Sequence, residues 1–239
     1  MPWDFWIILL LLAVVLPWRG RQRMRALMAL PEVTGGERIR LYLSTLLFQW
    51  ALSAAIFWRA RARGLTAAEM GLTVRYDFPV VFIAVAGGVQ IALAHWKNLR
   101  RMAGLHHPAA ERLRALAVRI FPRTPPQLWL YLALALTAGF CEEFIFRGFL
   151  VAAFFRAGLA AWAVVLFTSA LFGLVHIYQG RGGSIGTGIL GVLFAVARIA
   201  YTSLVPLVVW HATLDLVAGF AGARYLIAAK STGESEQKA

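Results

Sequence analysis

Seven apolar segments divide this chain, and most of them are long enough to cross the hydrocarbon core of a lipid bilayer as helices. Hydrophobic residues make up 60% of the sequence, which exceeds the roughly 45–50% of a soluble domain. We therefore predict an all-α, multispan transmembrane bundle of seven to eight helices. The predicted spans cover residues 5–18, 41–58, 78–95, 127–150, 159–178, 185–200 and 204–222.

Basic residues are concentrated in alternate loops, chiefly at 19–40, at 97–123 and in the tail from residue 224. Cytoplasmic loops of membrane proteins carry such an excess of Lys and Arg, so we expect an outside N-terminus and an inside C-terminus. The net charge of +13 then reflects contact with a lipid bilayer and not with nucleic acid. The first span lacks a basic start and a small-residue cleavage site, which favours a retained anchor over a cleaved signal peptide.

Segments outside the spans have patterns of their own. Residues 111–121 place apolar side chains on one helical face, which predicts an interfacial amphipathic helix, either an ordinary connector or a substrate gate. The glycine-rich residues 180–188 predict a flexible loop, without the ending of a phosphate-binding loop. We expect an N-terminal membrane region at 1–125, a catalytic core at 126–225 and a disordered tail at 226–239.

Ionisable residues inside a bilayer mark functional sites, because each costs at least about 2.5–3.5 kcal/mol on insertion scales. The last four predicted spans nevertheless contain seven such residues: Glu142, Glu143, Arg147, His176, Arg198, His211 and Asp215. Cys141 is the only cysteine, which excludes an internal disulfide and a cysteine-based zinc cluster. Its apolar surroundings favour a small core residue over a nucleophile.

Glu143 and Arg147 are four residues apart, so they share a helix face and can form an ion pair. Glu142 lies on a different face of the helix and is free to contact another group. An ion pair that only fixes helix packing would explain Glu143 and Arg147, but it leaves Glu142 unexplained.

Two imidazoles follow on later spans. His176 lies four residues after Phe172 and suits either a hydrogen-bonded core position or a catalyst. His211 and Asp215 are also four residues apart, so Asp215 can either orient His211 or share a polar cavity with it. The helical rise counted from the turn between their spans puts Glu142 and His176 at similar depths on neighbouring helices.

Two mechanisms suit these side chains. In one, Glu142, His176, His211 and Asp215 bind Zn²⁺ and leave an open position for water. In the other, Glu142, assisted by His176, is a general base that activates water, while His211 and Asp215 stabilise the oxyanion. Both predict hydrolysis of an amide bond, and the spacing does not distinguish them.

Three motifs, each on its own span, resemble those of the CAAX-protease and bacteriocin-processing family of intramembrane proteases, the family of the prenyl-protein endopeptidase. In chain order they are Glu-Glu-x-x-x-Arg (Glu142, Glu143, Arg147, extended by Phe146, Gly148 and Leu150), Phe-x-x-x-His (Phe172, His176) and His-x-x-x-Asn/Asp (His211, Asp215). The resemblance covers about residues 128–220. It implies an all-α intramembrane endopeptidase with a site open to the cytosol.

Roles follow from the same resemblance. Glu142, His176, His211 and Asp215 are expected to be catalytic, and the supporting residues are Glu143, Arg147 and Phe172. The family has been described both as metalloproteases and as glutamate proteases, so Zn²⁺ stays an open alternative. The expected partners are a lipid bilayer and a membrane-anchored protein or peptide, cleaved in CAAX-type processing or bacteriocin maturation.

The composition suggests a protein of the bacterial cytoplasmic membrane. Two interpretations without proteolysis stay open. Buried Glu, His and Arg can form a path in a small proton- or ion-coupled transporter, although the sequence shows no repeated halves. A non-catalytic immunity protein of the same family is the other interpretation, although the motif residues are intact.

Overall fold

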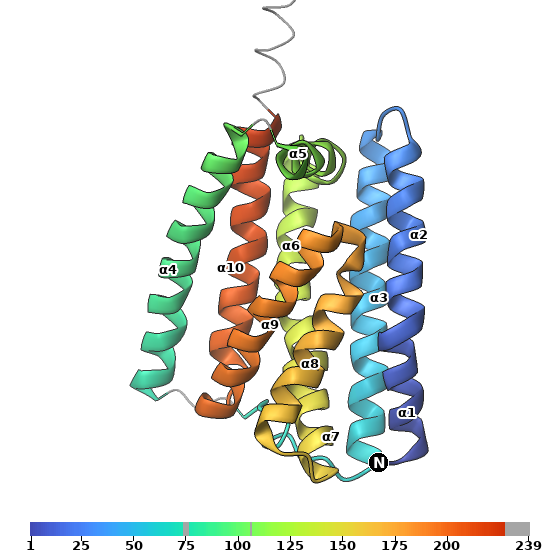
Figure 1. Ribbon diagram of the computed structural model, residues 1–239, viewed down its shortest axis with the longest axis vertical. Helices are drawn as coiled ribbons and strands as arrows, with labels where there is room; N and C mark the ends of the chain where they lie inside the picture. The colour runs from blue at the N-terminus through green and yellow to red at the C-terminus, as the bar shows by residue number, and fades with distance from the viewer. Residues whose placement is uncertain (74–76, 106, 228–239) are drawn as a thin grey trace, which may run out of the picture.

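The computed structural model describes residues 1–73, 77–105 and 107–227, and these ranges are helical with no β-strand. Within them, six helices are long and apolar enough to cross a membrane. They are α1–η1–α2 (Trp3–Ala29), α3 (Gly35–Ala62), α4 (Phe78–Ala103), α6–η2–α7 (Pro125–Arg156), α9 (Arg181–Tyr201) and α10–η4 (Val205–Ile227). The predicted all-α multispan bundle is confirmed (Figure 1).

Local signals explain where several helices begin. Thr34 caps α3, because its hydroxyl accepts a hydrogen bond from the Glu37 backbone while the Glu37 carboxylate accepts one from the Thr34 backbone. Proline in the first turn starts α4, α6 and α10, where its missing N–H has no helical partner to lose. The part of the predicted tail beyond residue 227 lies outside the described residues.

The flexible loop predicted at residues 180–188 is wrong, because α9 already begins at Arg181. Within residues 180–188, only Gly180 has the positive φ that favours glycine, at +86°. A glycine of α8 (Ala161–Val175) lets α9 approach closely, because a Cβ on Gly173 would lie 2.9 Å from the Ser184 carbonyl oxygen. Gly173 therefore serves helix packing, as small residues do in membrane bundles.

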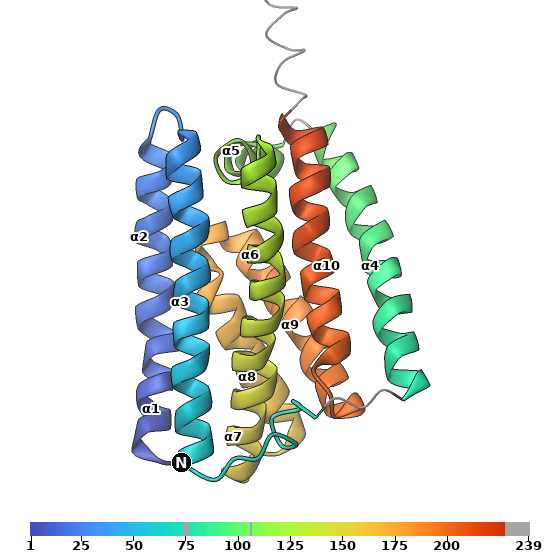
Figure 2. The ribbon, with the colours of Figure 1, turned by 180° about the vertical axis from the view of Figure 1, so that it is seen from behind.

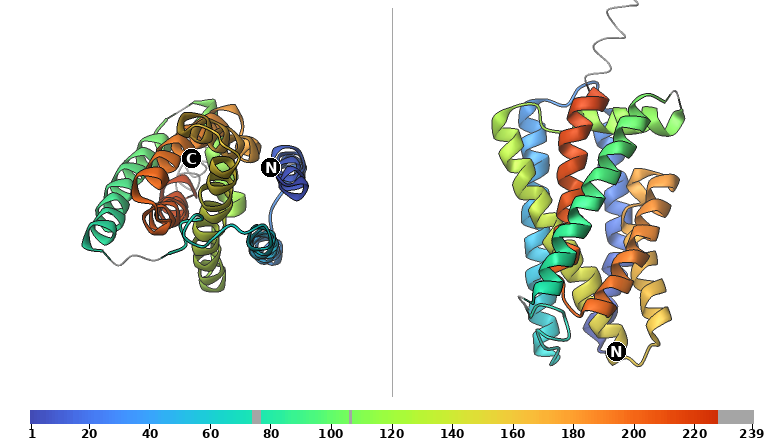
Figure 3. Two further views of the ribbon diagram at one scale, coloured as in Figure 1. Left: turned by 90° about the horizontal axis from the view of Figure 1, so that it is seen from below. Right: turned by 90° about the vertical axis from the view of Figure 1, so that its left-hand side faces the viewer.

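Helices α8 and α9 form an inclined hairpin that turns within the bundle. The connecting turn, with the 3₁₀ segment η3 (Ile177–Gln179), stops well short of the end reached by α2, α3, α6 and α10 (Figures 1 and 3). Helix α8 has only 15 residues, so the span predicted at 159–178 is not a full crossing. The hairpin thus places its polar turn partway along the length of the bundle.

The predicted amphipathic helix at residues 111–121 is present as α5 (Pro108–Ile120), which lies across the end of the bundle where α6 begins (Figures 1 and 2). Arg38 of α3 donates hydrogen bonds to two carbonyls near the end of α5, and the Tyr42 hydroxyl donates to the last one. These donors satisfy carbonyls that a helix end leaves unpaired. A gate role for α5 stays a hypothesis.

The first helix packs against the segment that carries the Glu-Glu-x-x-x-Arg motif. Phe5 of α1 (Trp3–Leu10) meets Phe149 edge to face at a centroid distance of 4.8 Å. Ile56 of α3 and Met70 of the following loop belong to the same buried cluster. One core therefore joins the N-terminal helices to the predicted catalytic region, while the domain boundary itself stays a prediction.

Candidate active site

The two adjacent carboxylates lie where one long helix changes its winding. Helix α6 (Pro125–Glu143) ends at Glu143, and the next six residues form the π-helical segment η2 (Phe144–Phe149) before α7 (Leu150–Arg156) resumes the α-helix. Single π-helical turns inside α-helices occur frequently at functional sites. Arg147 lies within this turn, so the change of winding sets its direction relative to Glu142 and Glu143.

Glu143 and Arg147 form a fully buried ion pair, with Arg147 Nη1 3.0 Å from Glu143 Oε1. The guanidinium carbon lies 4.0 Å from the centroid of the Phe172 ring, which is a cation–π contact. The same Glu143 oxygen lies 2.7 Å from Nδ1 of His211 on α10 (Val205–Gly222). Glu143 therefore joins the first motif to the third, and Phe172 of the second motif supports its partner.

Glu142 lies close to both imidazoles. Its Oε2 lies 3.5 Å from His176 Nε2 and 3.8 Å from His211 Nε2. No described group donates a hydrogen bond to this buried oxygen. The second carboxylate oxygen, Oε1, accepts a hydrogen bond from the Gln49 amide of α3 at 2.9 Å.

Hydrogen bonds on the far side of each ring fix how the two imidazoles are presented. His176 Nδ1 lies 2.7 Å from the Phe172 carbonyl oxygen, which can only accept, so Nδ1 carries a proton. His211 Nδ1 faces the Glu143 carboxylate and carries a proton for the same reason. In each ring, Nε2 is then the nitrogen that faces Glu142.

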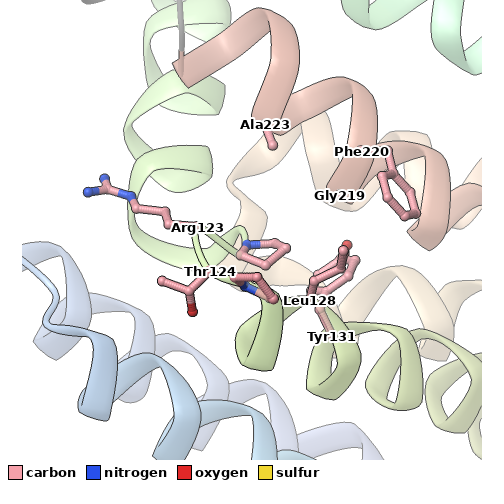
Figure 4. A pocket seen from close by; sticks show the side chains of 9 residues that line it. Arg123, Thr124, Leu128, Tyr131, Gly219, Phe220 and Ala223 are labelled. Atoms are coloured by element: carbon pink, nitrogen blue, oxygen red, sulfur yellow. The ribbon is translucent and has the colours of Figure 1, made fainter.

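Asp215 lies at the edge of this group. Its Oδ2 is 3.9 Å from His211 Nε2, and its side chain is 38% exposed, in contrast to the buried Glu143. The backbone carbonyl of Asp215 accepts a hydrogen bond from the Tyr131 hydroxyl at 2.8 Å. Tyr131 also lines a cavity of about 300 Å³ between the start of α6 and the end of α10 (Figure 4). Tyr131 thus contacts both this cavity and the backbone of Asp215.

The same four side chains are the predicted Zn²⁺ ligands. Zn²⁺ in proteins requires three or four His, Cys or carboxylate ligands around one point. The described residues contain no group of three or more such side chains arranged to hold a metal ion. In this arrangement the four side chains therefore do not fit a bound zinc.

Residues 124–217 match the model of the family described as type II CAAX prenyl endopeptidase Rce1-like. The chain carries an Rce1-like domain. No match was found among curated proteins or among solved structures. The family supports a CAAX-type intramembrane protease in general, and the helices agree with a multi-pass membrane protein.

The Rce1-like domain brings together all four residues predicted to be catalytic, and the three supporting residues lie directly behind them. Arg198 stands apart, because its guanidinium donates to the Glu69 carbonyl at 2.7 Å and holds a loop. Sequence reasoning missed Gln49, which lies outside the domain. Its only signal was a polar amide in the middle of an apolar span.

Proposed function

We propose that this protein is an intramembrane endopeptidase of the glutamate type, with Glu142 as the general base. One observation carries the proposal: Glu142 Oε2 is buried, has no donor among the described residues, and lies within 3.8 Å of imidazole nitrogens from two other helices. A carboxylate held this way is suited to take a proton from water.

The first step is the activation of water. Glu142 Oε2 and His176 Nε2 are both acceptors, so a water molecule between them can donate both of its protons. Donating to Glu142 and His176 directs a lone pair of the water oxygen toward the substrate. Glu142 takes a proton as that oxygen attacks the carbonyl carbon of the peptide bond, which forms a tetrahedral oxyanion.

The second step stabilises the oxyanion and releases the amine. His211 enters the reaction with protons on both ring nitrogens, so its Nε2 donates to the oxyanion while Glu143 on Nδ1 stabilises the imidazolium. Asp215 acts through His211, because an ionised carboxylate cannot donate to an oxyanion. Glu142, assisted by His176, returns its proton to the leaving nitrogen as the carbon–nitrogen bond breaks.

The substrate that suits this site is a membrane-anchored protein or peptide. The site includes His176 at the end of α8, where the α8–α9 hairpin turns partway along the bundle, and the neighbouring helices are apolar. We place the enzyme in a bacterial cytoplasmic membrane, with the α5 end toward the cytosol. The basic segment at residues 19–40, which includes the turn between α2 and α3, lies with α5 toward this end, which supports that orientation (Figure 2).

The test is cleavage of internally quenched peptides by the protein in proteoliposomes, with lipidated CAAX-type and unlipidated anchored peptides compared. Glu142→Gln is expected to lower kcat by about 10²- to 10⁴-fold, the range that a general base contributes. Glu32→Gln, the same change on an exposed carboxylate, is the matched control. Cleavage that survives Glu142→Gln in a folded protein would contradict the proposal, and proton flux without any cleavage would favour a transporter.

A further inference from the structure

We infer that Gln49 is a positioning residue for the catalytic carboxylate, supplied by a helix outside the Rce1-like domain. The inference rests on the proposed function of Glu142. Gln49 lies in α3 (Gly35–Ala62), and its Nε2 donates to Glu142 Oε1 at 2.9 Å. The family match begins only at residue 124. A helix of the N-terminal region thus reaches one oxygen of the proposed base.

The amide selects which carboxylate oxygen can accept a proton. An amide N–H only donates, so Oε1 of Glu142 is kept in its ionised, hydrogen-bonded form. The other oxygen, Oε2, faces His176 and His211 and lacks a donor among the described residues. The proton taken from water is therefore directed to Oε2, beside the imidazoles that assist the reaction.

The orientation of this amide follows from the same contact. Turning the amide over would set the Gln49 oxygen against a carboxylate oxygen, which is repulsive. In the observed orientation, Gln49 Oε1 is buried and accepts no hydrogen bond from any described residue. This amide donates to Glu142 although its own buried oxygen has no donor. Burying an unsatisfied oxygen costs free energy, and helix packing alone does not explain that cost.

Packing between α3 and α6 has its own supports close by. Trp50, the next residue, donates from Nε1 to Thr137 Oγ1 at 3.1 Å and stacks on Phe140 at a centroid distance of 5.5 Å. These contacts join the same two helices without touching Glu142. Trp50 therefore provides a control variant that removes a hydrogen bond from the interface and leaves the carboxylate alone.

The experiment compares Gln49→Met, Gln49→Glu and Trp50→Phe with the wild-type protein in the same proteoliposome assay. Met has nearly the shape of Gln but donates nothing, so kcat should fall about 10- to 100-fold with KM little changed, the loss of one hydrogen bond to a charged group. Glu at position 49 sets a second carboxyl against Oε1 and donates only while it is protonated. Its activity should recover as the pH falls, whereas Gln49→Met shows no such recovery.

Two outcomes would overturn the inference: a Gln49→Met protein whose kcat matches that of Trp50→Phe, or identical pH profiles for Gln49→Met and Gln49→Glu. A second measurement separates this failure from failure of the proposed function. The infrared carboxylate band of Glu142, assigned from a Glu142→Gln difference spectrum, should shift in Gln49→Met and stay in place in Trp50→Phe. That shift is required even when no peptide is cleaved, and a band that does not move contradicts the contact.

Discussion

Removal of the Arg147 guanidinium is the sharpest test of what holds the three motifs together. Arg147 and Glu143 are both 0% exposed and 3.0 Å apart, so no solvent screens the pair. Breaking a buried ion pair by removing one partner costs about 3–5 kcal/mol, because the other charge is left buried. In Arg147→Met, Glu143 keeps His211 as a partner, so we expect the lower half of this range.

The second variant adds Glu143→Gln to Arg147→Met. A glutamine oxygen at position 143 can still accept from His211 Nδ1, and no uncompensated charge remains. The double variant should therefore recover most of the stability that the single variant loses, as neutral replacements of buried pairs often do. It should not recover activity, because a neutral amide stabilises a protonated His211 less than a carboxylate does.

The single cysteine provides a way to follow unfolding by thiol labelling. Cys141 is fully buried and adjoins Glu142, so a thiol-reactive dye labels it only when this part of the bundle opens. A loss of about 3–4 kcal/mol should lower the Tm in detergent by about 6–16 °C, from the roughly 2–4 °C per kcal/mol of chains this size. A shift under about 2 °C for Arg147→Met, or a double variant no more stable than the single one, would refute the reasoning.

Two further predictions concern metal and pH. Since no proposed step uses a metal, cleavage should stay within about twofold after treatment with EDTA or 1,10-phenanthroline, and activity lost to chelation but restored by Zn²⁺ would instead support the zinc hypothesis. At the opposite end of the bundle from α5, hydrogen bonds from Thr66 lower the pKa of Glu69 below its usual range. The stability that Glu69 contributes is then present at neutral pH and is lost as the pH falls through its folded pKa. Below about pH 4, the Tm of the wild type should therefore drop more steeply than that of Glu69→Gln, and parallel curves of Tm against pH would contradict this.

Local spacing explains which features could be predicted from the sequence. The pairing of Glu143 with Arg147 follows from four-residue spacing on one helix face, and it is confirmed at 3.0 Å. The similar depth of Glu142 and His176 followed from counting residues to a tight turn, and the atoms lie 3.5 Å apart. Such predictions need only the geometry of one helix or one hairpin.

Features that depend on how helices distant in the sequence pack together could not be predicted from local spacing. Spacing suggested Asp215 as a residue that orients His211, yet the carboxylate on His211 Nδ1 is Glu143 of α6. Gln49 lies in a span without any motif, and only the packing of α3 against α6 gives it a role. The glycines after residue 180 lower helix propensity locally, and the close contact of Gly173 with α9 is visible only once the two helices are placed together.

The two adjacent glutamates have different kinds of partner. Glu143 is held at one oxygen by the guanidinium of Arg147 and by Nδ1 of His211, which together fix its direction. Glu142 is held through one oxygen by the neutral amide of Gln49, which positions it without a full charge. A cation at that position would bind the proton-free form more tightly and weaken it as a base. Proton exchange in this site therefore requires that the carboxylate beside the imidazoles be the one without an arginine, and the change of winding after Glu143 supplies that separation within a single helix.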